Sequence, residues 1–427
     1  MNHNKHNIIM KKTLTVIAFL VLGALASQAA PSVEVKGTRV TIKEGIDAAD
    51  EAQIKATSGI TQLRMEKISD ADLAKAVELF PDVTSVDIDS KTLTDLTPLA
   101  KLGKLESLVL KAKTASDLTP LAGLTGLKRL DVDAPMTNLA WMSKLTALQS
   151  IRINGEDKLT DLQGLPSLPD MKYVEFTHIA PADLAPLVAA LPGLTDLNLR
   201  YAKISDLAPL SGLTGLKRLN LYGSELADFS PLAACSKLTY LMYYAVKGAD
   251  FSTLGKLTQL EELDGGLTKL DNIAWLPNLT RLKKFDLFAE HVTDYSPLAQ
   301  TNIEQLKIWN MNKPVDLGPV AKMPALKKLV LDGLNEATGS KALAALPKLE
   351  ELEIVNGYNK EEGSEQFDFS GGGWTALKKL RIRELPLQPA QIDAMKKMPA
   401  LESLDVDKKS CADDALTGFD PKVKIRR

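Results

Sequence analysis

The sequence predicts one solenoid, built from short units that each add a strand to a continuous parallel sheet. Two observations support this prediction. First, a stretch of 22 residues at 194–215 begins again at once at Leu216, with apolar residues at the same offsets. Second, the leading apolar residue recurs along almost the whole chain, every 21 to 24 residues except for one interval of 28. Because one such unit is too short to bury its own apolar edge, the units must stack on one another.

Each unit divides into a strand and a return path. The leading residues of the sixteen units are Ile60, Val83, Leu105, Leu127, Leu148, Met171, Leu194, Leu216, Leu238, Leu260, Leu282, Ile303, Leu326, Leu349, Leu377 and Leu401. Leu194, Leu197 and Leu199 show the spacing that opens most units, and its last two apolar positions alternate as in a short strand. The apolar residues after the strand recur every three residues, which is typical of a chain that returns through tight turns or a 3₁₀ helix.

The motif DLTPLAGLTGLKRLDV at residues 117–132 has near-copies at Asp95 and Asp206. It resembles the internalin-like class of bacterial leucine-rich repeats, and the resemblance covers nearly the whole mature chain. It implies an α/β solenoid, a right-handed superhelix with a concave parallel sheet, and a surface or host-interaction role. Those repeats usually carry Asn eight residues after the leading residue. Here that position holds residues such as Ala202, Ser224 and Thr268, so the bends must satisfy their backbone groups in another way.

The convex side is predicted to mix 3₁₀ and α-helical return paths. Most paths follow D-L-[TS]-P-L, as at residues 95–99 and 294–298. Pro suits the first helical turn there, and the Thr or Ser before it can cap the turn. Residues 70–80, 181–190, 340–345 and 390–397 are predicted to be true helices, similar to the helical repeats of ribonuclease-inhibitor-like proteins. The 28-residue unit contains a polar, Gly-rich loop at 357–373, interpreted as a tolerated insertion or, alternatively, a binding loop.

The N-terminal residues 1–29 are interpreted as a secretory signal peptide. Lys11 and Lys12 precede an apolar run at 14–25, and a small-x-small site ends at Ala29. The run is too short to favour a membrane span, and no second candidate follows it. We therefore expect an exported chain that begins at Ala30 or Pro31 and is periplasmic or secreted, with cell-surface association left open.

The remaining chain is predicted to have a capped repeat domain. Residues 30–59 predict a hairpin and a helix that cap the first repeat, and residues 60–427 form the leucine-rich-repeat domain of about sixteen repeats. The stub at 422–425 closes the C-terminal edge. Cys235 and Cys411 occupy core offsets eight units apart, roughly 40 Å at the usual strand spacing, so they cannot form a disulfide.

Charge and motifs exclude several functions. The full chain has 52 basic and 54 acidic residues; removal of three lysines with residues 1–29 changes 52 − 54 = −2 to 49 − 54 = −5. This mild acidity argues against nucleic acid as the main partner. His178 and His291 lie five units apart, about 24 Å, so they cannot share a metal ion. We predict no catalytic residue, cofactor or metal site.

Two groups of carboxylates need an interpretation. The first recurs once per repeat before the return path, which turn and cap roles explain: Asp95, Asp117, Asp206, Asp228, Asp250 and Asp294. The second lies near the N-terminus, where a cation site remains an alternative: Asp87, Asp89, Asp131 and Asp133. Lys111 lies between Asp89 and Asp133 on neighbouring strands, which favours charge pairing there instead.

The concave face should carry the side chains two, four and six residues after each leading residue. In its C-terminal half the charges alternate between neighbouring strands, from Glu261 and Glu262 opposite Lys283 and Lys284 onward to Asp407. We expect cross-strand ion pairs that neutralise this half.

The middle of the face differs, because aromatic residues gather there. The candidate partner-binding residues are Tyr173, Arg200, Tyr222, Tyr240, Met242, Tyr244, Gly266, Phe288 and Trp309. One interpretation is that the rings stack and stiffen the sheet; the other is a protein-binding patch with a notch at Gly266. The predicted function is an exported non-catalytic scaffold that binds a protein, or a glycan, through its concave face. The alternative is a structural, envelope-organising protein without a specific ligand.

Overall fold

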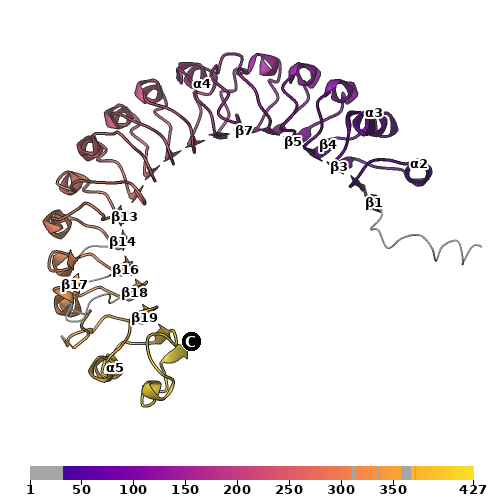
Figure 1. Ribbon diagram of the computed structural model, residues 1–427. Helices are drawn as coiled ribbons and strands as arrows, with labels where there is room; N and C mark the ends of the chain where they lie inside the picture. Colours follow the sequence, from indigo (N-terminus) through magenta and orange to yellow (C-terminus); the bar gives the residue numbers. More distant parts are fainter. Residues whose placement is uncertain (1–31, 310–313, 335–336, 357–366, 371) are drawn as a thin grey trace, which may run out of the picture.

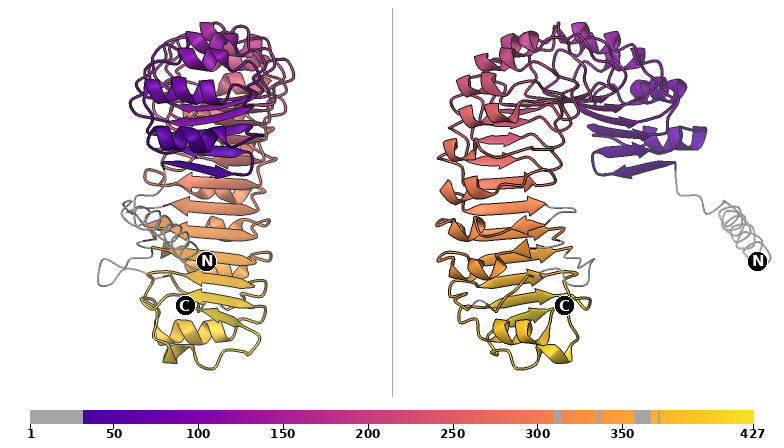
Figure 2. Two further views of the ribbon diagram at one scale, coloured as in Figure 1. Left: turned by 90° about the vertical axis from the view of Figure 1, so that its right-hand side faces the viewer. Right: turned by 60° about the vertical axis from the view of Figure 1, so that its left-hand side comes forward.

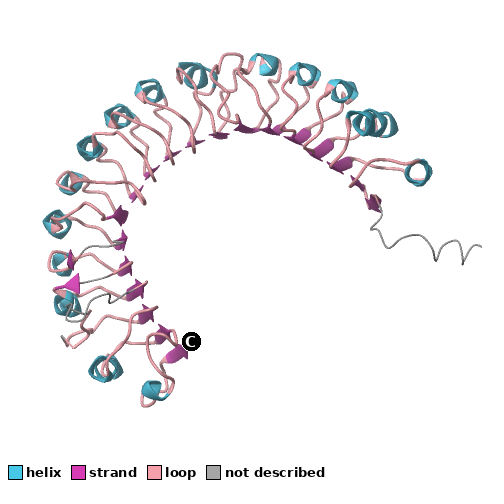
Figure 3. Ribbon diagram, in the orientation of Figure 1, coloured by secondary structure: helices cyan, strands magenta, loops and turns pink. Residues whose placement is uncertain are grey.

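In the part of the chain that the structure describes, one sheet of nineteen strands lines the inner side of an arc, and short helices occupy the outer side (Figure 1). The computed structural model describes residues 32–309, 314–334, 337–356, 367–370 and 372–427. The predicted signal peptide and most of the loop at 357–373 lie outside these residues. The predicted solenoid with a concave parallel sheet is confirmed, and Figure 3 shows the separation of strands from helices.

The strands follow one another along the chain. They are β1 (Val33–Lys36), β2 (Arg39–Ile42), β3 (Gln62–Glu66), β4 (Ser85–Asp89), β5 (Ser107–Lys111), β6 (Arg129–Asp133), β7 (Ser150–Asn154), β8 (Tyr173–Thr177), β9 (Asp196–Asn198), β10 (Arg218–Asn220), β11 (Tyr240–Met242), β12 (Glu262–Asp264), β13 (Lys284–Phe288), β14 (Gln305–Trp309), β16 (Lys328–Asp332), β18 (Glu351–Val355), β19 (Lys379–Ile382), β20 (Ser403–Val406) and β21 (Lys424–Arg426). A separate pair, β15 (Val315–Asp316) and β17 (Ala337–Thr338), forms a small second sheet.

The return paths are helical in most repeats. The α-helices are α2 (Ala48–Lys55), α3 (Asp70–Leu79), α4 (Ala185–Ala190) and α5 (Pro389–Lys396). The 3₁₀ helices are η1 (Thr97–Lys101), η2 (Thr119–Gly123), η3 (Ala140–Met142), η4 (Ala208–Gly212), η5 (Ser230–Ala234), η6 (Phe251–Lys256), η7 (Leu276–Asn278), η8 (Ser296–Gln300), η9 (Val320–Lys322), η10 (Ser340–Ala345) and η11 (Asp414–Leu416).

The repeat spacing sets the sheet register. Leu219 of β10 pairs with Leu197 of β9 on one side and Leu241 of β11 on the other, so equal offsets lie side by side. These leucines point into the core between the sheet and the convex helices, where they are buried. Figure 2 shows the resulting stack of parallel strands from the side. The core is therefore continuous along the arc, with each repeat covering the apolar edge of the one before it.

The return paths correct two details. In the D-L-[TS]-P-L repeats the turn before the 3₁₀ helix is capped by Asp and not by the Thr or Ser after it: Asp95 Oδ1 accepts from the Thr97 N–H at 2.8 Å, and in the related repeat at 206–210 Asp206 Oδ1 accepts from the Ala208 N–H at 2.7 Å. An Asx-type turn of this kind explains the once-per-repeat carboxylates. Residues 340–345, expected to be an α-helix, form the 3₁₀ helix η10, in which the Ala342 N–H donates to the Gly339 carbonyl at 3.1 Å.

The two ends of the described chain carry added strands. β1 and β2 form an antiparallel hairpin, and β2 continues the sheet by pairing in parallel with β3. The α2 helix follows, with a capping box between Asp47 and Asp50 and with Ile54 buried against the core. At the other end, β21 pairs in parallel with β20.

Of the two cysteines expected to lie in the core, one is fully buried. Cys235 is buried, Cys411 is partly buried, and both are free thiols. The end of the long loop is anchored, because Phe367 and Phe369 are buried and the Trp374 Nε1–H donates to the Phe369 carbonyl at 3.0 Å.

Candidate functional site

The concave face presents the predicted offsets. In the repeat that begins at Leu216, Leu219 and Leu221 are buried, whereas Arg218 and Asn220 are not. Pairing of Arg218 with Tyr240 and of Asn220 with Met242 continues these rows onto the next strand. Side chains at one offset therefore form rows across the strands, and their neighbours can be read along each row.

The bends at the end of the strands replace the missing Asn with backbone geometry. The Ala202 N–H donates to the Leu199 carbonyl at 3.1 Å, and Tyr201 between them has a φ of 57°. A positive φ at the third residue of a turn is the sign of a type II turn. Asn198 Oδ1 also accepts from the Arg200 N–H at 3.2 Å. The cost is a non-glycine residue in the left-handed region, about 1 kcal/mol or more for each.

This bend recurs along the middle of the solenoid and produces a column of rings. Left-handed residues seven positions after the leading residue include His178, Tyr201, Ala245 and Leu267. Two of them, His178 and Tyr201, are aromatic, and the next two repeats carry a tyrosine one position earlier, six residues after the leading residue. We use the name ring column for the four residues His178, Tyr201, Tyr222 and Tyr244.

The ring column is continuous. Ring centroids lie 4.7 Å apart between His178 and Tyr201, 4.8 Å between Tyr201 and Tyr222, and 5.1 Å between Tyr222 and Tyr244. The Arg200 guanidinium lies over the Tyr222 ring at 4.8 Å and over the Tyr201 ring at 5.0 Å. The stacking interpretation of the aromatic residues is therefore correct for Tyr222 and Tyr244. His178 and Tyr201 were missed because only the left-handed bend turns their offset onto this face.

The other candidate residues lie around the column. Tyr173 is 37% exposed, and its hydroxyl donates to Glu175 Oε2 at 2.7 Å. The Arg218 guanidinium covers the Tyr240 ring at 3.7 Å, beside Met242 on the same strand. Five strands separate Tyr173 from Trp309, so the candidate residues form an extended strip and not one pocket.

The expectations for Gly266 and Phe288 were wrong. A Cβ added at Gly266 would lie 1.9 Å from Cε2 of Tyr244, so the Tyr244 ring fills the predicted notch. Phe288 is only 5% exposed, and Trp309 is its neighbour in register on β14. The inner side of a curved sheet crowds bulky residues on adjacent strands, so Phe288 contributes to packing and offers little contact area.

Two carboxylates at the centre of the strip were not recognised from the sequence. Asp264 of β12 and Asp286 of β13 are direct neighbours in register. Burial, followed by the Asp264 charge, raises the pKa of Asp286 to about 6. Burial also raises the pKa of Asp264. The sequence does contain a pattern that could have identified them. Both are acids at the same offset of adjacent repeats, whereas elsewhere on the face the charge changes sign from one strand to the next.

The predicted charge alternation in the C-terminal half is confirmed. Lys328 Nζ lies 2.6 Å from Glu353 Oε1 and 3.3 Å from Glu351 Oε2. Lys379 pairs with Glu351 on the other side, and the Arg381 guanidinium lies 3.5 Å from Asp405 Oδ2. This charge ladder, from Lys328 to Asp405, neutralises the face beyond the strip.

No family model and no curated protein matches the chain. Solved structures do match. An internalin (inlF) of Listeria monocytogenes has 24% identity and a TM-score of 0.58, over 71% of this chain and 92% of that one. A leucine-rich-repeat protein of Leptospira interrogans has 18% identity and a TM-score of 0.58, over 90% and 93%. The chain has a leucine-rich-repeat fold.

Other leucine-rich-repeat structures are similar over a shorter part of their length. The TLR13–ssRNA13 complex has 17% identity and a TM-score of 0.53, over 89% of this chain and 55% of that one. At these identities the similarity concerns the fold alone. The ligand of this chain depends on the side chains of its own surface.

The ladder of backbone hydrogen bonds between neighbouring repeats is interrupted beside Tyr173. In the other repeats from Ile60 to Leu401, the N–H groups one and two residues after the leading residue donate to a single carbonyl of the preceding strand. The Lys172 and Tyr173 N–H groups make no such bond to Gln149, although the structure describes all three residues. Pairing of β7 with β8 accordingly begins one step late, at Ile151 and Val174.

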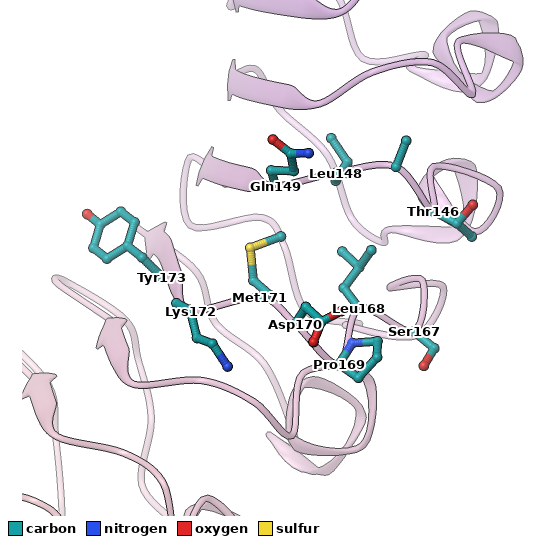
Figure 4. Close-up of a pocket in the computed structure, with 11 residues that line it drawn as sticks. Thr146, Leu148, Gln149, Ser167, Leu168, Pro169, Asp170, Met171, Lys172 and Tyr173 are labelled. Carbon is teal, nitrogen blue, oxygen red and sulfur yellow. The ribbon is translucent and has the colours of Figure 1, made fainter.

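A pocket of about 420 Å³ opens at this break (Figure 4). Leu148, Leu168 and Met171 line it toward the core, and Gln149 and Lys172 border it from the two strands. The return path explains the opening, because residues 163–170 contain no helix between η3 and α4. Pro166 and Pro169 lie in this segment, and proline cannot donate the hydrogen bonds of a 3₁₀ turn.

Reactive chemistry is sparse in the described residues. The His178 Nδ1 lies 3.9 Å from Asp157 Oδ1, and burial raises the pKa of the Cys235 thiol to about 11. Among the residues that the structure describes, no group of three or more His, Cys, Asp or Glu side chains could hold a metal ion. The alternative cation site near the N-terminus is explained by pairing, since Lys111 lies 3.8 Å from Asp89. No helix in the described part of the chain is long and apolar enough to cross a membrane.

Proposed function

We propose that this chain is an exported, non-catalytic scaffold that binds a protein ligand through the middle of its concave face. The observation that carries the proposal is the part of the strip between Arg200 and Trp309, in which tyrosine, tryptophan and arginine side chains lie close together. These residue types dominate binding energy at protein interfaces. Five strand steps give this part of the strip a length of about 24 Å, which suits one side of a standard interface.

The surface charge favours protein over nucleic acid. The similar TLR13 structure is a complex with ssRNA, so the fold alone does not choose the ligand. The centre of this strip carries Asp264 and Asp286, and the chain after residue 29 has a net charge of −5 (49 − 54). Phosphate groups would be repelled there.

Export is part of the proposal and rests on residues 1–29. The positive segment, apolar run and cleavage site follow the order of a secretory signal. We expect the purified cellular protein to begin at Ala30 or Pro31 and to be found in periplasmic or secreted fractions. N-terminal sequencing after fractionation tests this, and an intact N-terminus on cytoplasmic protein would refute it.

A structural role is the second candidate, and the ring column favours it. Rings from His178 to Tyr244 already contact each other, and Arg200 covers two of them. A strip that only packs on itself would stiffen the sheet of an envelope-organising protein without a specific ligand.

Capture from envelope and secreted fractions separates the two candidates. We expect wild-type protein to retain a defined protein, and Tyr244→Ala and Trp309→Ala each to weaken this binding by about 2 kcal/mol or more. Lys379→Ala is the matched control on the same face, and its loss should be about 1 kcal/mol or less because exposed ion pairs contribute little. Thermal unfolding of each variant monitors the fold, since Tyr244 also packs in the ring column.

The outcomes are distinguishable. Retention of a ligand that survives protease treatment would identify a glycan in place of a protein. If the aromatic variants bind as the wild type does and the charge-ladder variant does not, the binding surface lies in the C-terminal half. If nothing is retained by the wild type, the structural role stands.

A further inference from the structure

The middle of the concave face is an exposed sheet surface with a local negative charge. Asp264 and Asp286 occupy the same offset on β12 and β13, with Met242 beside Asp264 on β11. The half-buried Tyr240 and Tyr244 rings lie on β11 and just beyond it. The surface therefore combines two adjacent carboxylates with apolar side chains on one flank.

The nearby lysines are engaged with other anions. Lys284 donates to Glu262, its neighbour on β12. Lys307 Nζ lies 3.6 Å from Asp332 Oδ2 and 3.3 Å from the centroid of the Trp309 ring. Within the described residues, neither Asp264 nor Asp286 has a cation within 4.0 Å.

The charges around Asp264 and Asp286 do not balance. Four carboxylates, of Glu262, Asp264, Asp286 and Asp332, stand against the two amines of Lys284 and Lys307, which leaves 2 − 4 = −2. In the charge ladder, by contrast, each strand opposes charges of the other sign. Like charges directly opposite on neighbouring strands are destabilising, so this pair lacks the balance that the rest of the face has.

We propose that the centre of the concave face binds a cationic side chain, an arginine or lysine presented by a protein partner. Its guanidinium or ammonium group lies between Asp264 and Asp286, and its methylenes lie against Met242 and Tyr244. This inference rests on the proposed protein-binding function and names the chemistry of the partner at that site. Arginine suits the pair better than lysine, because its planar donors can engage two carboxylates at once.

Binding of a cation here is linked to pH. The side chains that face Asp286 are Glu262 and Asp264 from β12, Lys284 from its own strand and Lys307 from β14, with Tyr240 and Tyr244 on the β11 side. Burial and the Asp264 charge raise the pKa of Asp286 to about 6. A cation binds the ionised form, so affinity should rise as pH increases through about 6 and fall below it.

Small probes test the site without a known partner. The cationic probe is N-acetyl-arginine methylamide, and its neutral near-isostere is N-acetyl-citrulline methylamide. Binding to the processed full chain is followed by ligand-observed NMR at about pH 7.5 and about pH 5. We expect saturable binding of the arginine probe in the millimolar range, about tenfold weaker binding of citrulline, and at least a severalfold loss at the lower pH.

Matched variants locate the effect. Asp264→Asn combined with Asp286→Asn should weaken the arginine probe about tenfold, and each single variant should have an intermediate effect. Asp405→Asn is the control, because Asp405 has the same offset in its repeat but is paired with Arg381 and Arg383; its affinity should stay within about twofold of wild type. Circular dichroism checks that each variant is folded.

Three results with the probes would overturn the inference: equal binding of arginine and citrulline, wild-type affinity in the double variant, or no saturable arginine binding up to about 50 mM. Failure here is distinguishable from failure of the proposed function. If a captured partner depends on Tyr244 and Trp309 but not on Asp264 and Asp286, the cation inference falls while the binding scaffold stands.

Discussion

At the residue scale, a shift of one position decides between core and surface. Tyr243 is fully buried, its hydroxyl has no hydrogen-bond partner among the described residues, and burial raises its pKa. Tyr244, the next residue, stacks on Tyr222 in the ring column. Side chains alternate across a strand, so the same residue type is structural at one offset and a candidate contact at the next.

The ionised Asp286 side chain should lower the stability of the folded chain. Its pKa is about 6 in the folded chain against an ordinary value of 3.8, so between these values the folded state binds more protons than the unfolded state. Stability should therefore fall as pH rises through this window. We expect Asp286→Asn to be more stable than wild type by about 1–3 kcal/mol near pH 7, with the difference vanishing at about pH 3.

Guanidinium unfolding of both proteins at the two pH values measures this difference. Asp405→Asn serves as the comparison, because it removes a carboxylate that is paired with arginine and should not stabilise the chain. Equal stability of Asp286→Asn and wild type near pH 7 would show that Asp286 is not destabilised by its surroundings.

At the element scale, the strand that begins at Tyr173 is held less firmly than its neighbours. The Thr195 and Asp196 N–H groups donate to the Lys172 carbonyl at 3.0 Å and 2.9 Å, whereas the Lys172 and Tyr173 N–H groups lack the equivalent bonds to Gln149. The adjoining pocket opens this end of the β7–β8 pair to solvent.

Hydrogen exchange reports this break directly. The Lys172 and Tyr173 amides should exchange at least about tenfold faster than the Thr195 and Asp196 amides, because exchange follows local hydrogen bonding and exposure. The comparison is internal, since both pairs occupy the same offsets in successive repeats. Similar protection of the two pairs would mean that the ladder is closed in solution.

At the scale of the whole molecule, the open edges of the sheet need covers. The β1–β2 hairpin pairs with β3, and α2 packs Ile54 against the core. Without them, the β3 edge would present unpaired backbone groups and uncovered apolar surface, which is a template for association.

Removal of residues 32–59 tests this role. We expect the truncated chain to unfold at a lower temperature and to self-associate, because the edge of β3 becomes exposed. Size-exclusion chromatography with light scattering and thermal unfolding measure both effects against the chain that begins at Ala30. A monomeric truncated protein with an unchanged midpoint would show that the hairpin and helix are dispensable.

The architecture could be predicted from the repeat alone, because a constant spacing places equal offsets of neighbouring units side by side. The leucines around Leu219, the parallel register and the paired charges around Lys328 all follow from that spacing. These features depend only on which side of a strand a residue occupies and which residue lies next to it.

The way in which side chains share the space on the concave face could not be predicted from the repeat and depends on the folded arrangement. The Tyr244 ring covers Gly266, Phe288 is buried beside Trp309, and left-handed bends bring His178 and Tyr201 into the ring column. That Asp264 and Asp286 lack a paired cation is evident only from the structure, in which Lys284 and Lys307 lie beside other anions. Offsets determine the neighbours, but sheet curvature, bend geometry and competition among several neighbours determine which contacts form, and no single repeat encodes these.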